Sequence, residues 1–261
     1  MRVLVTFAVD AEFAPWRKRH NFQRQELGVP HSYRSDCVYQ GIVHGLNVDV
    51  YLTGIGWTGV RAGLYHLLSQ KPQLCISSGL AGGLKVALLR GQIVAAREVF
   101  KGSDGGAKVR GRGRLLAIAE ESGATLVDRF ITASQIVSQA QFKKALGQFG
   151  DVVEMESYHV LNMTTGPQVA SIAIRAISDV VNEDLPLDFG KVLEPDGRLN
   201  LRQLALQLGR YPHRIPALVR FGRASEKVTV TLADFLDKYI AAVASKSPQW
   251  FISEEEAVVP V

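Results

Sequence analysis

Short apolar runs typical of buried strands alternate with helix-like segments over the first 177 residues of this chain. Several of them, such as 2–9 and 168–177, are apolar almost throughout, which is typical of strands covered on both faces. The expected strands are 2–9, 36–43, 46–53, 73–78, 91–99, 124–132, 151–155 and 168–177, and the expected helices are 11–19, 57–69, 114–122, 139–148 and 156–164. The alternation predicts an α/β fold, a three-layer sandwich with a central mixed β-sheet.

The last third of the chain has a different pattern. From about residue 198 it is predicted to form helices broken by Pro212 and Pro216, ending in an amphipathic helix near 228–245. Residues 101–114 carry five glycines and five basic residues, which is typical of a mobile loop. Because no repeat or linker-like run divides the chain, we expect one domain, 1–261, with an extended helical region at about 198–245.

The composition, with 47% hydrophobic and 21% charged residues, is that of a soluble globular protein. The first apolar run is too short for a signal peptide, and no run is long enough for a membrane helix, which favours the cytoplasm. Cys37 and Cys75 lie in apolar stretches and are expected to be buried free thiols. The histidines show no metal-ligand spacing, so we expect no metal.

A GxGxxG motif, Gly54 to Gly59, follows an expected strand and precedes an expected helix. A dinucleotide-binding fold also needs an acid about 20 residues further on, to bind a ribose hydroxyl. No Asp or Glu occurs between Asp49 and Glu98. The dehydrogenase interpretation therefore fails, and a tight turn at the edge of a ligand site explains the glycines.

Three acidic residues, Glu12, Glu156 and Asp179, each follow an apolar run. Carboxylates at strand ends lie at the edge of a sheet, where α/β proteins place their ligand sites. Partial burial raises the pKa of such a carboxyl group and suits it to proton transfer. The alternative is that each acid merely caps the next helix.

The segments around these acids are AVDAEF (8–13), TGIG (53–56), SGLAGGL (78–84), VEMES (153–157) and RAISDV (175–180). Together they resemble the nucleoside phosphorylase/hydrolase superfamily, and within it the methylthioadenosine/S-adenosylhomocysteine nucleosidases, over about residues 1–184. The resemblance implies a nucleoside phosphorylase-like sandwich and a homodimer that needs no cofactor. It also implies hydrolysis of the N-glycosidic bond of a purine nucleoside, adenosine-type and modified at the 5′ carbon.

The same resemblance assigns roles to individual residues. Glu12 matches the residue that polarises the attacking water, Asp179 the acid that serves the purine N7, and Glu156 the residue that binds the ribose hydroxyls. Ser178 would orient the base or Asp179, and Met155 would pack against the sugar. Two further positions contribute to the site: Arg175 would balance the buried acids, and the turn at Gly82 would bring backbone N–H groups near the ligand.

The match is weaker in the base pocket and at the phosphate position. Adenine-specific relatives carry an Asp and an aromatic residue where this chain has 132–138, so backbone groups around Val137 would have to bind the purine edge. Phosphorylases carry an Arg and a Ser or Thr where this chain has Ser77 and Leu80. Water is therefore the expected nucleophile. A phosphate-dependent purine nucleoside phosphorylase and a non-catalytic nucleoside-binding protein remain the alternatives.

Basic residues are concentrated in residues 198–227, which hold seven Lys or Arg against one acid, whereas the whole chain carries +5. A nucleic-acid-binding protein would usually show a larger excess, so we expect no nucleic-acid partner. The simplest interpretation is solvated arginines on helices that pack over the core. The alternatives are a cover over the 5′ end of the substrate and a weak contact with an anionic membrane surface.

Overall fold

The computed structural model describes residues 1–27, 37–56, 62–103, 106–187, 189–192, 200–247 and 250. Within these residues, the strands are β1 (Arg2–Phe7), β2 (Gln23–Glu26), β3 (Cys37–Val43), β4 (Leu46–Leu52), β5 (Leu74–Gly83), β6 (Ile93–Lys101), β7 (Lys108–Arg110), β8 (Thr125–Thr132), β9 (Val152–Glu154) and β10 (Ala170–Asp179). The helices are α1 (Asp10–His20), α2 (Ala62–Ser69), α3 (Gly113–Glu121), α4 (Ala140–Leu146), α5 (Ser157–Thr165), α6 (Phe189–Val192), α7 (Leu201–Arg210), the 3₁₀ turn η1 (Pro212–Arg214) and α8 (Ile215–Ala244).

The strands form one mixed sheet in the order β10-β6-β8-β9-β5-β1-β4-β3-β2. β1 lies between β4 and β5 and is parallel to both. β5 is also parallel to β10, which in turn pairs antiparallel with β6. Because β10 pairs with both β5 and β6, five strands (β5, β10, β6, β8 and β9) close into a ring, while β1 to β4 extend from it as an open sheet.

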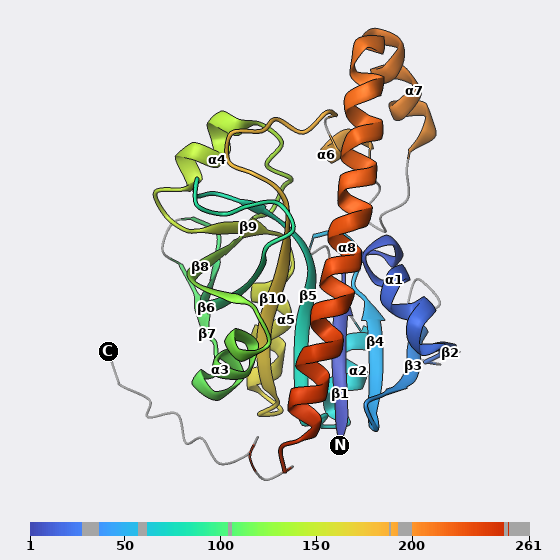
Figure 1. Cartoon of the computed structure of the whole chain (residues 1–261), viewed down its shortest axis with the longest axis vertical. Coiled ribbons are helices and arrows are strands. Elements are labelled where there is room, and N and C mark those ends of the chain that lie inside the picture. The colour runs from blue at the N-terminus through green and yellow to red at the C-terminus, as the bar shows by residue number, and fades with distance from the viewer. Residues whose placement is uncertain are drawn as a thin grey trace.

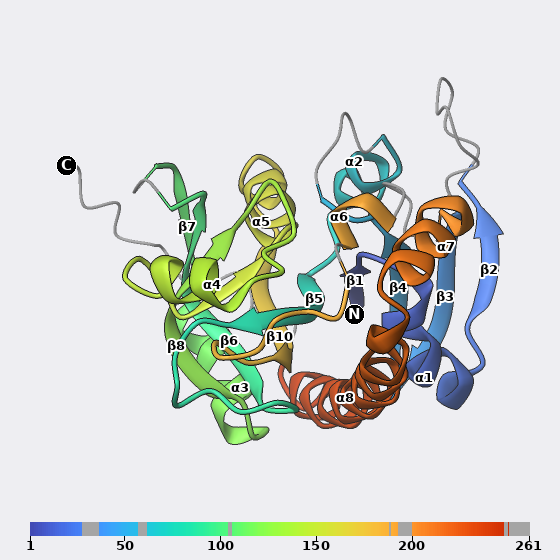
Figure 2. The same ribbon diagram turned by 90° about the horizontal axis from the view of Figure 1, so that it is seen from above.

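Helices cover both faces of this sheet, so the predicted three-layer sandwich is confirmed. In Figure 2, α2 and α5 lie on one side of the strands, and α1, α3 and α8 lie on the other. The alternation of side chains along β1 shows the same division. Val3, Val5 and Phe7 pack into the core under α1 and α8, whereas Leu4 packs into the core under α2 and α5. The near-continuous apolar runs of the sequence thus reflect burial on two faces.

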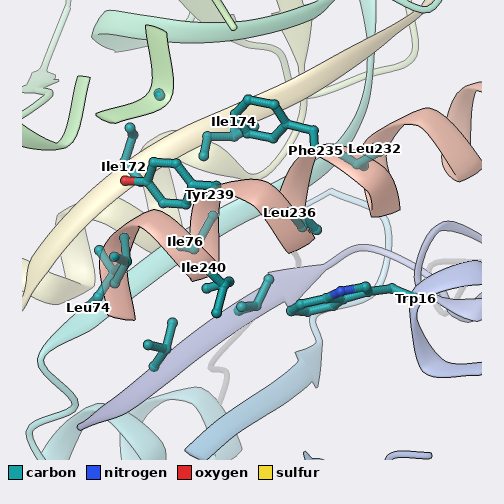
Figure 3. Packing of buried hydrophobic residues seen from close by; sticks show 14 of the residues in the cluster. Trp16, Leu74, Ile76, Ile172, Ile174, Leu232, Phe235, Leu236, Tyr239 and Ile240 are labelled. Carbon is teal, nitrogen blue, oxygen red and sulfur yellow. The ribbon is translucent and has the colours of Figure 1, made fainter. Parts of the chain in front are cut away.

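The C-terminal part of helix α8 crosses one face of the sheet, and its N-terminal end extends beyond the strands (Figure 1). In its C-terminal half, Phe235 and Tyr239 lie beside Ile172 and Ile174 of β10, as Figure 3 shows. The helix predicted near 228–245 is therefore confirmed, but it begins earlier than expected, at Ile215. The prediction that Pro216 breaks this region was wrong, because Pro216 lies in the first turn, where the missing N–H has no helical partner to lose.

Other parts of the sequence interpretation also need correction. Strand β2 was not predicted, since its four residues are polar and exposed at the edge of the sheet. Part of the expected mobile loop 101–114 is strand β7, which pairs with β6; residues 104 and 105 lie outside the described residues. The two cysteines are free thiols, as expected, but only Cys75 is buried. Among the described residues, no helix is long and apolar enough to cross a membrane.

Candidate active site

The three predicted acids meet at one edge of the sheet. Glu12 lies in the first turn of α1, directly after β1, and Asp179 is the last residue of β10. Glu156 occupies the N-cap position of α5, after β9. β1 and β10 are both parallel to β5, so their carboxyl ends converge beside the glycine-rich end of β5.

A cavity of about 520 Å³ opens at this edge, a size typical of small-molecule sites. Seven of the eight predicted site residues line it: Glu12, Gly82, Val137, Met155, Glu156, Ser178 and Asp179. The eighth, Arg175, is buried behind the acids. Two glycines let neighbouring groups approach closely, because a Cβ on Gly82 would lie 3.1 Å from the Asp179 carboxylate, and one on Gly56 would lie 3.1 Å from the Met155 methyl group.

Glu12 is held by backbone N–H groups from two elements. Its carboxylate accepts hydrogen bonds from the N–H groups of Ala8 at 3.0 Å and Val9 at 3.4 Å, which precede it in the chain. It accepts a third from the N–H group of Leu80 in β5, at 2.9 Å. The helix-capping interpretation is thus partly right for this residue, but the contact with Leu80 fixes the carboxylate in the cavity as well. Burial raises the pKa of Glu12, although Arg175 and the three N–H groups partly offset the effect.

Arg175 lies at the centre of a buried charge cluster. Its guanidinium donates to Glu154 at 2.6 Å and to Ser157 at 2.9 Å, and it lies 3.5 Å from Glu156. Arg175 thus lies beside Glu154 and Glu156, and its principal partner, Glu154, was not singled out from the sequence. The VEMES segment contains both Glu154 and Glu156. Glu154 belongs to a fully buried strand, and a buried acid needs a charged partner, so this was the signal that could have pointed to it.

Glu154 and Glu156 have opposite electrostatic environments. Burial acts to raise the pKa of Glu154, but Arg175, the Thr132 hydroxyl and the N–H groups of residues 156 and 157 outweigh it and hold the pKa below its usual range. Burial also raises the pKa of Glu156, to about 8, because Arg175 offsets only part of the effect and the charges of Glu154 and Glu12 add to it. One guanidinium cannot neutralise three carboxylates, so the cluster favours retention of a proton near neutral pH.

Asp179 is held by two neighbours. The hydroxyl of Ser178 donates to Oδ1 at 2.7 Å. The other carboxylate oxygen, Oδ2, is paired with the ammonium group of Lys143 on α4. The sequence reasoning missed Lys143, because a Lys-Lys pair in a short helix is ordinarily solvated.

The cavity continues past the acids, between α1, α6 and α8. Its lining there includes the apolar Ala14, Pro15, Phe189 and Phe221, with the two phenylalanine rings 5.5 Å apart between centroids. The polar side chains of Lys18, Ser225, Glu226 and Thr229 line the same region. Among the described residues, no group of three or more His, Cys, Asp or Glu side chains is arranged to hold a metal ion. Residues 57–59 of the GxGxxG motif lie outside the described part of the chain.

The chain is similar in sequence and in fold to several known proteins. A curated 5′-methylthioadenosine/S-adenosylhomocysteine nucleosidase of Glaesserella parasuis is 28% identical over 184 residues, which are 60% of this chain and 78% of that protein. The crystal structure of the corresponding Campylobacter jejuni nucleosidase has a TM-score of 0.65 at 14% identity and covers 92% of this chain and 99% of its own. A native structure of futalosine hydrolase from Helicobacter pylori has a TM-score of 0.64 at 17% identity, over 92% and 97% of the two chains.

The two solved structures establish the shared fold. The sequence model of a family described as "Phosphorylase superfamily" matches residues 2–199 of this chain. The resemblance inferred from five short segments is thereby confirmed. Since the match spans most of the chain, this protein belongs to the phosphorylase superfamily.

Proposed function

We propose that the protein is an N-glycosyl hydrolase that cleaves purine nucleosides, adenosine-type and modified at the 5′ carbon. The observation that carries this proposal is the placement of Glu12 and Asp179 in one cavity, where Asp179 is buried, Glu12 is half-buried and each is fixed by hydrogen bonds. The nucleosidase from Glaesserella parasuis supports the same reaction class. The family resemblance also supports a cytoplasmic homodimer without a cofactor.

The two carboxylates have complementary roles in this reaction. Glu12 takes a proton from water, which attacks the anomeric carbon, and its raised pKa suits it to act as a base near neutral pH. Asp179 delivers a proton to N7 of the departing purine as the glycosidic bond breaks. The sugar becomes cationic in the transition state, so the buried carboxylates also stabilise it electrostatically. Glu156 binds the ribose hydroxyls, and Met155 packs against the sugar.

The base lies toward the loop before α4. Gln135, Ile136 and Val137 line this end of the cavity, together with Asp179. Their backbone groups bind the purine edge, and apolar contact with Ile136 and Val137 replaces aromatic stacking. Arg175 keeps the carboxylate cluster in place without touching the substrate.

Water as the nucleophile is supported by the charges of the cavity. Its described lining carries the carboxylates of Glu12, Glu154, Glu156, Asp179 and Glu226, and one cationic side chain, Lys18. A phosphate dianion requires cationic or N–H donors. However, the N–H of Leu80 is already bonded to Glu12, and Ser77 is buried with its hydroxyl 3.2 Å from that of Ser157.

A modified 5′ carbon is supported by the apolar continuation of the cavity. With Glu156 at the ribose and Val137 at the base, the 5′ end faces α1, α6 and α8. The side chains there include the apolar Pro15, Phe189 and Phe221, which offer contact to an apolar 5′ substituent, beside the polar Lys18, Ser225 and Glu226.

We also propose a weak contact with anionic membrane surfaces through the 198–227 region. Figure 1 shows α7 and the N-terminal end of α8 extending beyond the strands. This projecting tip exposes four large apolar side chains: Leu206, Tyr211, Ile215 and Val219. It also exposes six basic ones: Arg202, Arg210, Arg214, Arg220, Arg223 and Lys227. Apolar and basic side chains together are typical of membrane-surface helices.

The proposed activity is tested with a panel of purine nucleosides, unmodified and 5′-modified, by chromatographic detection of the free base. Wild-type protein should release base, and Asp179→Asn should still bind nucleosides while its turnover falls roughly 10²–10⁴-fold, the range for a lost general acid. An Asp179→Asn variant with wild-type turnover would remove this residue from the mechanism. Binding of nucleosides by the wild type without any release of base would favour a binding protein instead.

A further inference from the structure

Lys143 is a buried lysine that has no role in the proposed function. Its side chain is only 1% exposed, and lysine is almost never buried unless it is paired. The ammonium group has three protons to donate. Its three acceptors are the carboxylate of Asp179, the carbonyl of Glu183 at 2.8 Å and the carbonyl of Val180 at 3.3 Å.

The surroundings hold this contact in place from both sides. The Asp184 carboxylate accepts from the Ala140 N–H at 2.7 Å, at the start of α4, and the Leu185 N–H donates to the Ser138 carbonyl at 2.8 Å. The helix that carries Lys143 is therefore joined to the segment that follows Asp179. These two hydrogen bonds keep the ammonium group of Lys143 next to the carboxylate of Asp179.

This pairing raises a chemical problem for an acid. A carboxylate that is paired with an ammonium group has no acidic proton of its own, yet the departing base needs one. Ser178, the other side chain bonded to Asp179, is an alcohol and a poor acid. The ammonium of Lys143 is the acidic group that touches the carboxylate among the described residues.

We propose that Lys143 supplies the proton that Asp179 passes to the leaving base; the inference rests on the proposed function. As the C1′–N bond breaks, its electron pair moves onto the base, which becomes strongly basic. Lys143 transfers a proton to the Asp179 carboxylate, and the carboxylic acid that forms gives a proton to the base. The step leaves a neutral base, a carboxylate and a neutral amine, while Glu12 holds the proton lost by water. Solvent reprotonates the amine after the products leave.

Because Lys143 reaches the base only through Asp179, it is a positioning and proton-supplying residue. Other charged groups surround the pair. Glu183 forms an ion pair with Arg90, whose guanidinium also donates to the Ser178 carbonyl at 2.9 Å, and Asp184 caps α4. Glu12 and Glu156 face the cavity side. Lys144, the next residue on α4, is exposed and serves as a matched control.

Two substitutions separate proton supply from simple charge pairing. Lys143→Arg keeps a cation beside Asp179, but a guanidinium does not give up its proton in proteins, whereas Lys143→Met removes the charge. We expect both variants to lose roughly 10²–10⁴-fold in kcat with little change in KM. In the methionine variant Asp179 must take its proton from solvent, so the alkaline limb of the pH–rate profile should move to lower pH. Lys144→Met should keep the wild-type rate and profile.

The outcomes are distinguishable. If the wild type releases base and Lys143→Arg works within a few-fold of it, Lys143 is only a charge partner and the inference is overturned. A double variant, Lys143→Met with Asp179→Asn, removes both charges of this pair, so neither is left buried without its partner, and it guards against misfolding. Its kcat should be no lower than that of Asp179→Asn alone, since both residues act in one transfer; a further large loss would contradict the relay. If the wild type releases no base, it is the proposed function that fails.

Discussion

The carboxylate of Glu12 accepts a hydrogen bond from the backbone N–H of Leu80, with 2.9 Å between Oε1 and the nitrogen. The contact joins the first turn of α1 to the glycine-rich end of β5, two segments 68 residues apart in the chain. It fixes the carboxylate in the cavity. It also occupies an N–H group that a phosphate ion would otherwise use.

Glu12→Gln should lower turnover by roughly 10²–10⁴-fold, because an amide cannot accept the proton of the attacking water. The substitution keeps the size of the side chain, so nucleoside binding should change little. Steady-state kinetics together with calorimetric binding measure the two effects. Asp10→Asn is the matched control, since Asp10 lies in the same helical turn but pairs with Arg17 outside the cavity. Equal losses in both variants would point to a general effect on α1.

The raised pKa of Glu156 predicts a pH-dependent stability. The ordinary pKa is 4.5 and the folded value is about 8, so between these values the folded protein holds a proton that the unfolded chain has lost. Stability should therefore fall as pH rises from about 4.5 to about 8 and then level off. Glu12 acts in the same direction. Glu156→Gln should reduce the difference in Tm between pH 5.5 and pH 8.5, and an unchanged difference would contradict this origin.

Gly79 is predicted to be essential to the charge cluster. Its φ of +145° disfavours other residues, and a Cβ there would lie 2.5 Å from the Arg175 guanidinium and 3.0 Å from both carboxylate oxygens of Glu12. Gly79→Ala should displace both side chains, lower Tm and abolish measurable turnover. Gly222→Ala, in α8, meets no atom within 4 Å and should leave activity unchanged, with a gain of up to about 1 kcal/mol in helix stability. Similar behaviour of the two variants would argue against the steric explanation.

The sequence was sufficient to predict most strands and helices of the first 177 residues and the placement of three acids at strand ends, because buried strands and their exits leave a local pattern. Arg175 lies within one of these strands, β10, and could be singled out from the sequence. Its pairing with Glu154, however, depends on how β9 and β10 are placed around β5, which no local sequence pattern encodes. The position of Lys143 depends on the segment after β10 folding back onto α4. Pro216 was misread because a proline is compatible both with a break and with a helix start.

The membrane contact predicts binding of wild-type protein to phosphatidylglycerol vesicles at low salt. Each basic side chain near such a surface contributes about 1 kcal/mol, so changing four arginines to Gln should nearly abolish sedimentation with vesicles. The residues to change are Arg210, Arg214, Arg220 and Arg223. Added salt should mimic their loss. The control replaces four exposed lysines outside the tip with Gln: Lys71, Lys101, Lys144 and Lys238.

Equal loss of binding in the control variant would show that net charge alone determines the interaction. Absence of vesicle binding by the wild type would remove the proposal. Turnover of a small nucleoside should be the same in both variants, since none of the eight substituted residues lines the described cavity.

The choice between water and phosphate as nucleophile is the central claim, and product analysis tests it directly. A 5′-modified adenosine is incubated with the protein in phosphate-free buffer and again with added phosphate, and the sugar product is identified by mass spectrometry. We expect equal rates of base release and the free sugar in both, because carboxylates dominate the cavity and the Leu80 N–H is bonded to Glu12. A rate that depends on phosphate, with the sugar 1-phosphate as product, would contradict the hydrolase assignment and establish a phosphorylase.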